Sequence, residues 1–426
     1  MKIAAHTLGC KVNQYDTEAM LELFEKAGYE SVSMNDDADV YLINTCTVTG
    51  TGDQKSVKLI RRIHREHPQA HIIAAGCLTQ RDAKRVMLDG VLLAIGVQNR
   101  AKVVELYEEA VRTNTSIDAT ASVKGAKFEC LSVMRHEGKT RATMKIQEGC
   151  DRFCTYCIIP YVRGPVRSMP LEDVKKEAGR LADAGYPEIV VTGIHLGSYG
   201  REIGVKLIDA IECVCRTEGV ERVRIGSLEP VTVTEEFAGR LAENPEICPQ
   251  FHLSLQSGSE TVLKRMRRRY TPEEYLEAAR ILRKYFPNCA LTTDIIAGFP
   301  GETEEEAEET LLFVEKANFA RIHVFPYSRR SGTVADAMPD QVPEDIKKKR
   351  TAKLIEIGNK LELEYVNNTV GTCESVLFET ASPDGGAEGY TKSYVRVRAD
   401  AEPGEIKTVF IEKTEGTVAV GRVLNG

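Results

Sequence analysis

The sequence predicts an α/β protein of three domains: an N-terminal doubly wound parallel sheet, a central partial (βα)6 barrel, and a small C-terminal antiparallel β-barrel. Through most of the chain, strand-like apolar runs alternate with amphipathic helical segments, an order typical of parallel sheets. After residue 361 the pattern changes to short alternating strands separated by turns. We expect domain bounds at 1–125, 141–360 and 361–426.

Length and composition describe an ordinary globular protein. The 426 residues exceed what one hydrophobic core usually supports, and 28% charged with 42% hydrophobic residues is unremarkable. No apolar run has the length that spans a bilayer and the start lacks a secretory signal, so we expect no membrane association and a cytoplasmic location. In a reducing compartment, twelve cysteines favour metals or chemistry over disulfides. The net charge of −7 neither supports nor excludes an RNA partner, because local basic patches decide.

Three cysteines of the first domain follow predicted strands. The strands are expected at 2–8, 40–44 and 71–75, and Cys10, Cys46 and Cys77 come directly after them. The carboxyl edge of an open α/β sheet is where ligands bind, so the three thiols are expected to converge on a metal cluster. The alternative is three small buried side chains, since free cysteine is often buried.

The second domain opens with three thiols in one loop, Cys150, Cys154 and Cys157. Three thiols cannot all pair in disulfides, and a structural zinc site usually needs four ligands. The C-x3-C-x2-C spacing instead fits a four-iron cluster with one iron left without a protein ligand. Further strands at 188–192, 222–226, 251–255, 290–296 and 323–327 give about six βα units, with the site at their carboxyl ends.

Several stretches together resemble the radical S-adenosylmethionine enzymes: the cysteine loop, 192–194, 252–258 and 294–303. With the three-cysteine first domain they resemble the methylthiotransferase branch. The segments 7–16 and 44–49 resemble the subgroup that methylthiolates threonylcarbamoyladenosine in tRNA. The resemblance covers essentially the whole chain.

The resemblance implies two [4Fe-4S] clusters and S-adenosyl-L-methionine as cofactors. Cys150, Cys154 and Cys157 would hold the cluster that binds S-adenosylmethionine and generates a 5′-deoxyadenosyl radical. Cys10, Cys46 and Cys77 would hold an auxiliary cluster that carries the sulfur. The product would be the 2-methylthio derivative of N6-threonylcarbamoyladenosine at position 37 of tRNA. An electron donor is also implied; the sequence identifies neither this donor nor the oligomeric state.

The resemblance also assigns residues to S-adenosylmethionine. An aromatic side chain in the cysteine loop would lie against the adenine, and a glycine loop would also contact the adenine. Backbone groups at a strand end would contact the methionine moiety. Hydroxyl and amide side chains would form hydrogen bonds with the ribose or the methionine moiety. The alternative for each is ordinary packing or a satisfied turn. These residues are Tyr156, Thr192, Gly193, Ser254, Gln256, Ser257, Gly298 and Gly301.

Three basic groups are candidates for RNA contact, with a solvated surface as the alternative for each. The C-terminal barrel resembles the TRAM module, an RNA-binding barrel of the OB type, and mixes basic with aromatic side chains. A first-domain helix and the basic run 265–269 could neutralise phosphates or the threonylcarbamoyl carboxylate. The candidates are Arg61, Arg62, Arg65, Arg267, Arg268, Lys392, Tyr394 and Arg396.

Two alternatives to the proposed reaction stay open at this point. The same enzyme class could act on isopentenyladenosine in tRNA or on an aspartate of a ribosomal protein, although the segment 7–13 resembles neither subgroup. The chain could also be an iron–sulfur RNA-binding protein without catalysis. Simple binding needs no S-adenosylmethionine pocket, so the strand-end residues Gly193, Gln256 and Gly298 argue against that function.

Overall fold

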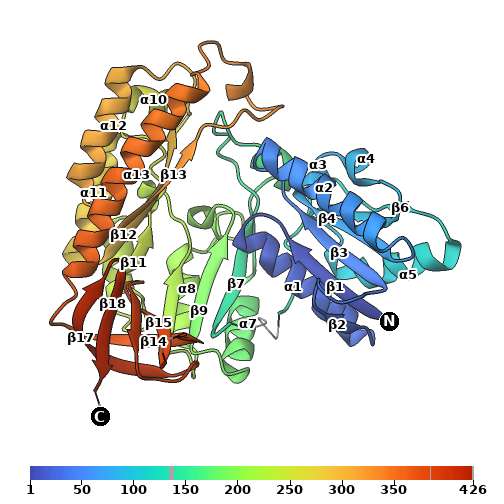
Figure 1. The fold of residues 1–426 in the computed structure, drawn as a ribbon, viewed down its shortest axis with the longest axis horizontal. Coiled ribbons are helices and arrows are strands. Elements are labelled where there is room, and N and C mark those ends of the chain that lie inside the picture. Colours follow the sequence, from blue (N-terminus) through green and yellow to red (C-terminus); the bar gives the residue numbers. More distant parts are fainter. Residues whose placement is uncertain (134–138, 384, 425–426) are drawn as a thin grey trace.

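The structure is a computed structural model that describes residues 1–133, 139–383 and 385–424. The N-terminal domain lies beside the central domain, and the small C-terminal domain lies below one end of the central strands (Figure 1). No helix in these ranges is both long enough and apolar enough to cross a membrane.

The N-terminal domain is a six-stranded parallel sheet with the order β2-β1-β3-β4-β5-β6. Its two faces are covered by different helices, so one core forms on Met20 and Phe24 and the other on Ile60 and Ile63. This confirms the doubly wound sheet. The strand β5 and the short edge strands β2 and β6 were not predicted from the sequence. The strands are β1 (Lys2–Thr7), β2 (Glu30–Val32), β3 (Val40–Thr45), β4 (His71–Gly76), β5 (Val91–Ile95) and β6 (Ile117–Asp118). The helices are α1 (Lys11–Lys26), α2 (Gly50–Glu66), α3 (Cys77–Arg81), α4 (Ala83–Val86), η1 (Arg100–Lys102) and α5 (Val103–Thr113).

The central domain confirms the partial barrel. The sheets β10-β9-β7-β8 and β11-β12-β13 are joined by isolated bridges from Val223 to Ile247 and from Leu228 to Leu253. Strands of the barrel pair in parallel, whereas the short β8 pairs with β7 in the antiparallel direction. The strands are β7 (Arg141–Glu148), β8 (Arg167–Ser168), β9 (Glu188–Gly193), β10 (Arg222–Ile225), β11 (Gln250–His252), β12 (Ala290–Ala297) and β13 (Arg321–Pro326).

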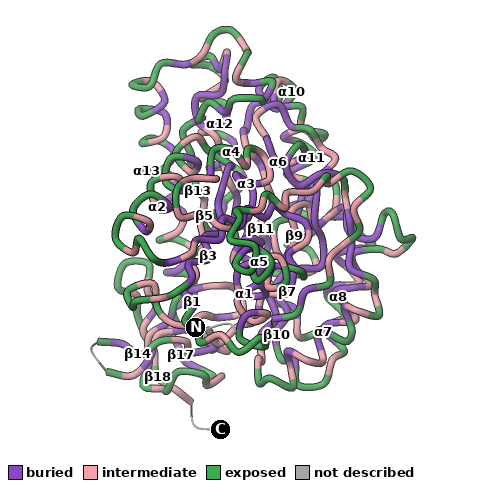
Figure 2. Tube along the Cα trace, turned by 90° about the vertical axis from the view of Figure 1, so that its right-hand side faces the viewer, coloured by how far each residue is buried: buried purple, intermediate pink, exposed green. Residues whose placement is uncertain are grey.

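Helices surround the barrel, and one continuous core fills the space between them and the strands. Figure 2 shows mostly buried strands inside a rim of exposed loops. The helices are α6 (Ile159–Arg163), α7 (Leu171–Asp183), α8 (Leu207–Cys215), α9 (Glu235–Ala242), α10 (Glu260–Arg265), α11 (Pro272–Tyr285), α12 (Glu304–Ala317) and α13 (Glu344–Asn367), with the 3-10 turns η2 (Leu196–Ser198), η3 (Pro230–Thr232) and η4 (Ala335–Ala337).

The C-terminal domain is a closed five-stranded barrel with the order β14-β15-β16-β18-β17, and its expected start at residue 361 falls inside α13. The alternating pattern of residues 390–398 predicts one strand, but the structure divides this stretch between two strands. Tyr394 has a φ of 69°, and its N–H closes a turn onto the carbonyl of Thr391, so the chain reverses there. The strands are β14 (Cys373–Ala381), β15 (Ala387–Thr391), β16 (Arg396–Ala399), β17 (Ile406–Glu415) and β18 (Val418–Val423).

Candidate functional site

The loop that carries Cys150, Cys154 and Cys157 connects β7 to α6 and is fixed at several points. The N–H of Cys150 donates to the carbonyl of Gly164 at 3.0 Å, and the N–H of Cys157 donates to the carbonyl of Cys154 at 2.9 Å. Thr155 donates hydrogen bonds from its N–H and its hydroxyl to backbone carbonyls of the barrel domain. The loop is therefore shaped by its own backbone and held against the barrel rim.

The three loop thiols lie close enough to influence one another. Burial raises the pKa of Cys150 to about 11 and that of Cys157 to about 12, and the negative charge of Cys154 adds to both shifts. Backbone N–H groups of Arg152 and Ile159 hydrogen bond to these two sulfurs and act in the opposite direction. Because a metal binds the thiolate, loading this loop must displace protons.

A buried carboxylate, Glu229, joins the cysteine loop to the barrel rim. Its oxygens contact Arg152 at 2.8 Å, His195 at 2.8 Å and Arg268 at 3.0 Å. Burial alone would raise the pKa of Glu229, but the hydrogen bond with His195 and the charges of Arg268, His195 and Arg152 lower it to about 2. Arg268 also donates from Nη1 to the sulfur of Cys154 at 3.3 Å.

Arg268 was expected to contact RNA, and Glu229, Arg152 and His195 were not predicted as site residues. The structure places the side chain of Arg268, only 7% exposed, at the cysteine loop. A signal for two of the missed residues was present, because His195 and Glu229 each follow a predicted strand at the edge where the site was expected.

The three cysteines of the first domain meet at the carboxyl edge of its sheet. Cys10 precedes α1, Cys46 follows β3, and Cys77 begins α3 after β4. Gly9 has a φ of 107°, and a β-carbon on it would lie 3.0 Å from the sulfur of Cys46, so this approach requires glycine. Burial raises the pKa of Cys77 to about 11, with the charges of Cys10 and Cys46 adding to the shift.

Both cysteine sets offer thiols, the donor type that an iron–sulfur cluster binds. Among the described residues, no group of three His, Cys, Asp or Glu side chains could hold one metal ion. A four-iron cluster makes a different demand, because each thiolate binds its own iron. Three thiols with N–H donors at their sulfurs fit such a cluster in donor type, and both sites provide this combination.

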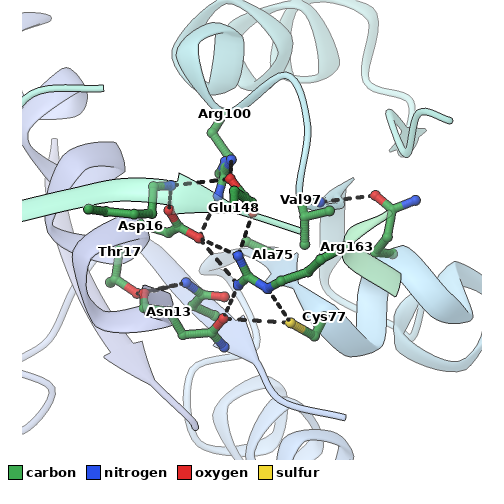
Figure 3. A network of polar contacts seen from close by, with 12 residues as sticks. Asn13, Asp16, Thr17, Ala75, Cys77, Val97, Arg100, Glu148 and Arg163 are labelled. Atoms are coloured by element: carbon green, nitrogen blue, oxygen red, sulfur yellow. Dashed lines mark hydrogen bonds and ion pairs between the residues drawn. The ribbon is translucent and has the colours of Figure 1, made fainter. Parts of the chain in front are cut away.

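A buried network of charges reaches Cys77 on one side (Figure 3), and its member Glu148 is two residues from Cys150. Asp16 of α1 and Glu148 of β7 are its carboxylates, and Arg100, Lys145 and Arg163 are cations that contact both of them. None of the five side chains is more than 3% exposed. The positive charges hold the pKa of Glu148 well below its usual range, against the effect of burial. The network joins the N-terminal domain to the barrel.

The residues expected at S-adenosylmethionine gather at the carboxyl ends of the barrel strands, but their local roles differ. Gln256 has a φ of 72°, and its backbone bonds the carbonyl of Asp294 and the N–H of Ile296. Strain of this kind in a residue other than glycine concentrates at functional sites. Ser257 is buried and bonds Thr310 at 3.2 Å, as a satisfied core residue would. Ser254 accepts through its carbonyl from Tyr270 at 2.5 Å.

The aromatic and glycine candidates pack closely. Tyr156 meets Phe299 edge-to-face at 6.4 Å. A β-carbon on Gly193 would lie 2.8 Å from Gln147, and one on Gly298 would lie 2.4 Å from Lys347. Gly298 and Gly301 both have a φ of 72°, which suits the predicted tight loop. Thr192 is buried beside Gly193 at the end of β9.

The candidate RNA residues occupy three different environments. Exposed arginines lie on α2 and beyond α10: Arg61, Arg62, Arg65 and Arg267. The C-terminal candidates instead contact neighbouring protein. Lys392 bonds the carbonyl of Pro245 at 2.7 Å, Tyr394 stacks on Tyr390 with ring centroids 4.6 Å apart, and Arg396 pairs with Glu388. The guanidinium of Arg224 lies 4.7 Å from the ring of Tyr394. Tyr394 therefore contributes to the contact between the C-terminal barrel and the central barrel.

A cavity of about 670 Å³ opens between the N-terminal domain and the segment after β13. Arg81, Arg85 and Arg330 all contact the buried carboxylate of Asp53, and Arg329 also lines the cavity. This cavity was not predicted from the sequence, because its arginines come from segments about 250 residues apart.

Comparisons with known proteins agree with this architecture. The Radical SAM superfamily profile matches residues 144–314, and that of the uncharacterized protein family UPF0004 matches residues 2–95. The chain is 44% identical, over 93% of its length and 89% of the relative, to threonylcarbamoyladenosine tRNA methylthiotransferase MtaB of Bacillus subtilis. It is 37% identical to the Thermotoga maritima protein of the same name, over 92% and 90% of the two chains. It is 36% identical to tRNA-2-methylthio-N(6)-dimethylallyladenosine synthase of Pelotomaculum thermopropionicum, over 87% and 85%.

Among solved structures, the radical S-adenosylmethionine methyltransferase TsrM of Kitasatospora setae superposes with a TM-score of 0.60 at 15% identity, covering 79% of this chain and 77% of that one. That likeness concerns the fold alone. The superfamily match implies a [4Fe-4S] cluster and S-adenosylmethionine, and the loop of Cys150, Cys154 and Cys157 fits such a cluster. By its extended identity to these relatives, the chain belongs to the radical S-adenosylmethionine tRNA methylthiotransferases.

Proposed function

We propose that this enzyme methylthiolates C2 of N6-threonylcarbamoyladenosine at position 37 of tRNA, with two [4Fe-4S] clusters. The observation that carries the substrate is the 44% identity, over 93% of the chain, to a relative named for threonylcarbamoyladenosine. The meeting of Cys10, Cys46 and Cys77 at one sheet edge supports the second cluster.

Cys150, Cys154 and Cys157 would hold the first cluster, which together with S-adenosylmethionine would supply radical chemistry. The chain's own groups orient the cofactor. Gly193, Gln256 and Gly298 present backbone at the strand ends, and Gly298 already donates its N–H to Glu302 at 2.9 Å. Glu229 and its cations fix the rim beside the loop.

Cys10, Cys46 and Cys77 would hold the auxiliary cluster, which would supply the sulfur. Cys10 is exposed, whereas Cys46 and Cys77 are buried. The exposed side is the one that substrate can approach, and the buried pair anchors the cluster to the sheet. An electron donor is required, and its identity is left open.

The arginine-lined cavity supports tRNA as the partner. Four guanidiniums, from Arg81, Arg85, Arg329 and Arg330, line it together with the carboxylates of Asp53, Asp82 and Asp336, leaving net positive charge. The first turn of α2 joins this cavity to the auxiliary site, since a β-carbon on Gly52 would lie 3.7 Å from the sulfur of Cys46. A phosphate or carboxylate oxygen of the modified anticodon loop suits this charge.

Mass spectrometry of tRNA nucleosides from a strain that lacks this protein tests the substrate. Loss of 2-methylthio-threonylcarbamoyladenosine with other methylthio nucleosides retained is the expected result. The second candidate is N6-dimethylallyladenosine, because relatives named for that substrate are 36% and 35% identical. Selective loss of the methylthio-dimethylallyl nucleoside would replace the first candidate by the second.

A further inference from the structure

A side chain of the barrel domain contacts a cysteine of the N-terminal domain. Arg163, at the end of α6, donates from Nε to the sulfur of Cys77 at 3.3 Å (Figure 3). Arg163 is fully buried, and α6 directly follows the loop of Cys150, Cys154 and Cys157. One short helix therefore joins the two cysteine sites.

The guanidinium of Arg163 is fixed in its orientation. Nη2 donates to Oδ1 of Asn13 at 2.5 Å, and Nη1 donates to Glu148 at 2.5 Å. Asn13 is itself fixed, because its amide nitrogen donates to the carbonyls of Leu8 at 2.8 Å and Thr45 at 3.0 Å. Its oxygen therefore faces Arg163, and the Nε–H of Arg163 is directed at the sulfur.

Neutralising the buried carboxylates does not by itself account for Arg163. Asp16 already contacts Arg100 and Lys145, and so does Glu148. A guanidinium placed only for charge balance would direct its donors at carboxylate oxygen, the stronger acceptor. Arg163 instead directs one donor at sulfur.

We propose that Arg163 is a positioning residue that raises the reduction potential of the auxiliary cluster and fixes that cluster relative to the radical-generating loop. The thiol sulfur of Cys77 stands here for the iron-bound thiolate. Reduction adds negative charge to the cluster, and an N–H donor with a nearby positive charge stabilises that charge, because hydrogen bonds to sulfur and local charge set cluster potentials. The inference rests on the auxiliary cluster of the proposed function.

The other cysteine site offers an internal comparison. Arg268 donates to the sulfur of Cys154 at the same distance, 3.3 Å, but it belongs to the same domain as the loop it contacts. Arg167 offers a second comparison. It is a buried guanidinium near Glu148, and it donates to the carbonyls of Arg163 and Pro165 rather than to a sulfur of any described residue.

The test measures a potential rather than activity. In full-length protein carrying the C150A, C154A and C157A substitutions, only the auxiliary cluster is reconstituted, and dithionite titration followed by electron paramagnetic resonance gives its midpoint. We expect R163K, which keeps the charge and loses the Nε–H, to lower the equilibrium constant for one-electron reduction about tenfold, which is about 59 mV. R268K in this background should leave the midpoint unchanged, and R167Q should shift it less than R163K does.

The outcomes test the existence of the auxiliary cluster separately from the role of Arg163. A parent triple variant that binds no iron overturns the auxiliary cluster and the proposed function with it. A parent that binds about four irons, with R163K at the parent midpoint, overturns only the role of Arg163. If circular dichroism finds R163K unfolded, R163Q replaces it; a lower midpoint supports the inference, and the parent midpoint overturns it.

Discussion

The two three-cysteine sites of this enzyme are built in opposite ways. Cys150, Cys154 and Cys157 lie within eight residues, on a loop whose own backbone bonds fix its shape. Cys10, Cys46 and Cys77 are separated by whole βα units, and the parallel sheet brings them together. The loop site is determined by one short stretch of sequence, whereas the site of Cys10, Cys46 and Cys77 forms only when the N-terminal domain folds.

The same contrast extends to the arginines at the sulfurs. Arg268 reaches Cys154 from within the barrel, but Arg163 reaches Cys77 across a domain boundary. The surroundings of the site formed by Cys10, Cys46 and Cys77 therefore depend on how the N-terminal and central domains dock. A change at the interface should disturb the auxiliary site before it disturbs the cysteine loop.

The largest expected effect comes from removing each cysteine set separately. The C150A/C154A/C157A variant should form no 5′-deoxyadenosine from S-adenosylmethionine. The C10A/C46A/C77A variant should still cleave S-adenosylmethionine and form no methylthio nucleoside. Chromatography of 5′-deoxyadenosine and mass spectrometry of tRNA digests measure the two activities. Methylthio product from the second variant would remove the auxiliary site from the mechanism.

The local site was the easier one to predict. The spacing of Cys150, Cys154 and Cys157 is visible in a window of eight residues, and it predicted a cluster without knowledge of the fold. The convergence of Cys10, Cys46 and Cys77 also followed from sequence, because strand periodicity together with parallel topology places all three at one edge.

The charge network between the sites could not be predicted. Asp16, Arg100, Glu148 and Arg163 lie in four separate elements, and each looks like an ordinary surface charge in its own segment. Only the docking of two domains makes them partners. Arg268 and Tyr394 illustrate the same limit, since basic and aromatic residues that suited RNA in sequence contact protein groups in the structure.

A second prediction concerns the buried charge network at the interface between the N-terminal domain and the barrel, which lies beside Cys77. R100A leaves the buried Asp16 and Glu148 without one of their cations, and removing one partner of a buried ion pair costs about 3–5 kcal/mol. Chemical denaturation of the variant should report a loss of that size. R396A is the matched control: the Arg396 side chain that pairs with Glu388 is 50% exposed, so the loss should stay below about 1 kcal/mol. Equal losses of unfolding free energy in R100A and R396A would contradict a larger stabilising role for the buried ion pairs at the interface.

The smallest effect is a pH dependence at the locally encoded site. The pKa of Glu229 is lowered to about 2 from an ordinary value of 4.5, so the folded protein prefers the ionised carboxylate. This stabilisation is complete above pH 4.5 and is lost as the pH falls toward 2, with a total of about 3 kcal/mol. E229Q lacks the titrating group but keeps a similar shape. The free energy of unfolding of the wild type should therefore fall toward that of E229Q between pH 5 and pH 2, as measured by urea denaturation. Parallel curves would mean that Glu229 is not held ionised by Arg152, His195 and Arg268. The cysteine loop would then lack the fixed negative charge that Glu229 places beside Arg152 and Arg268.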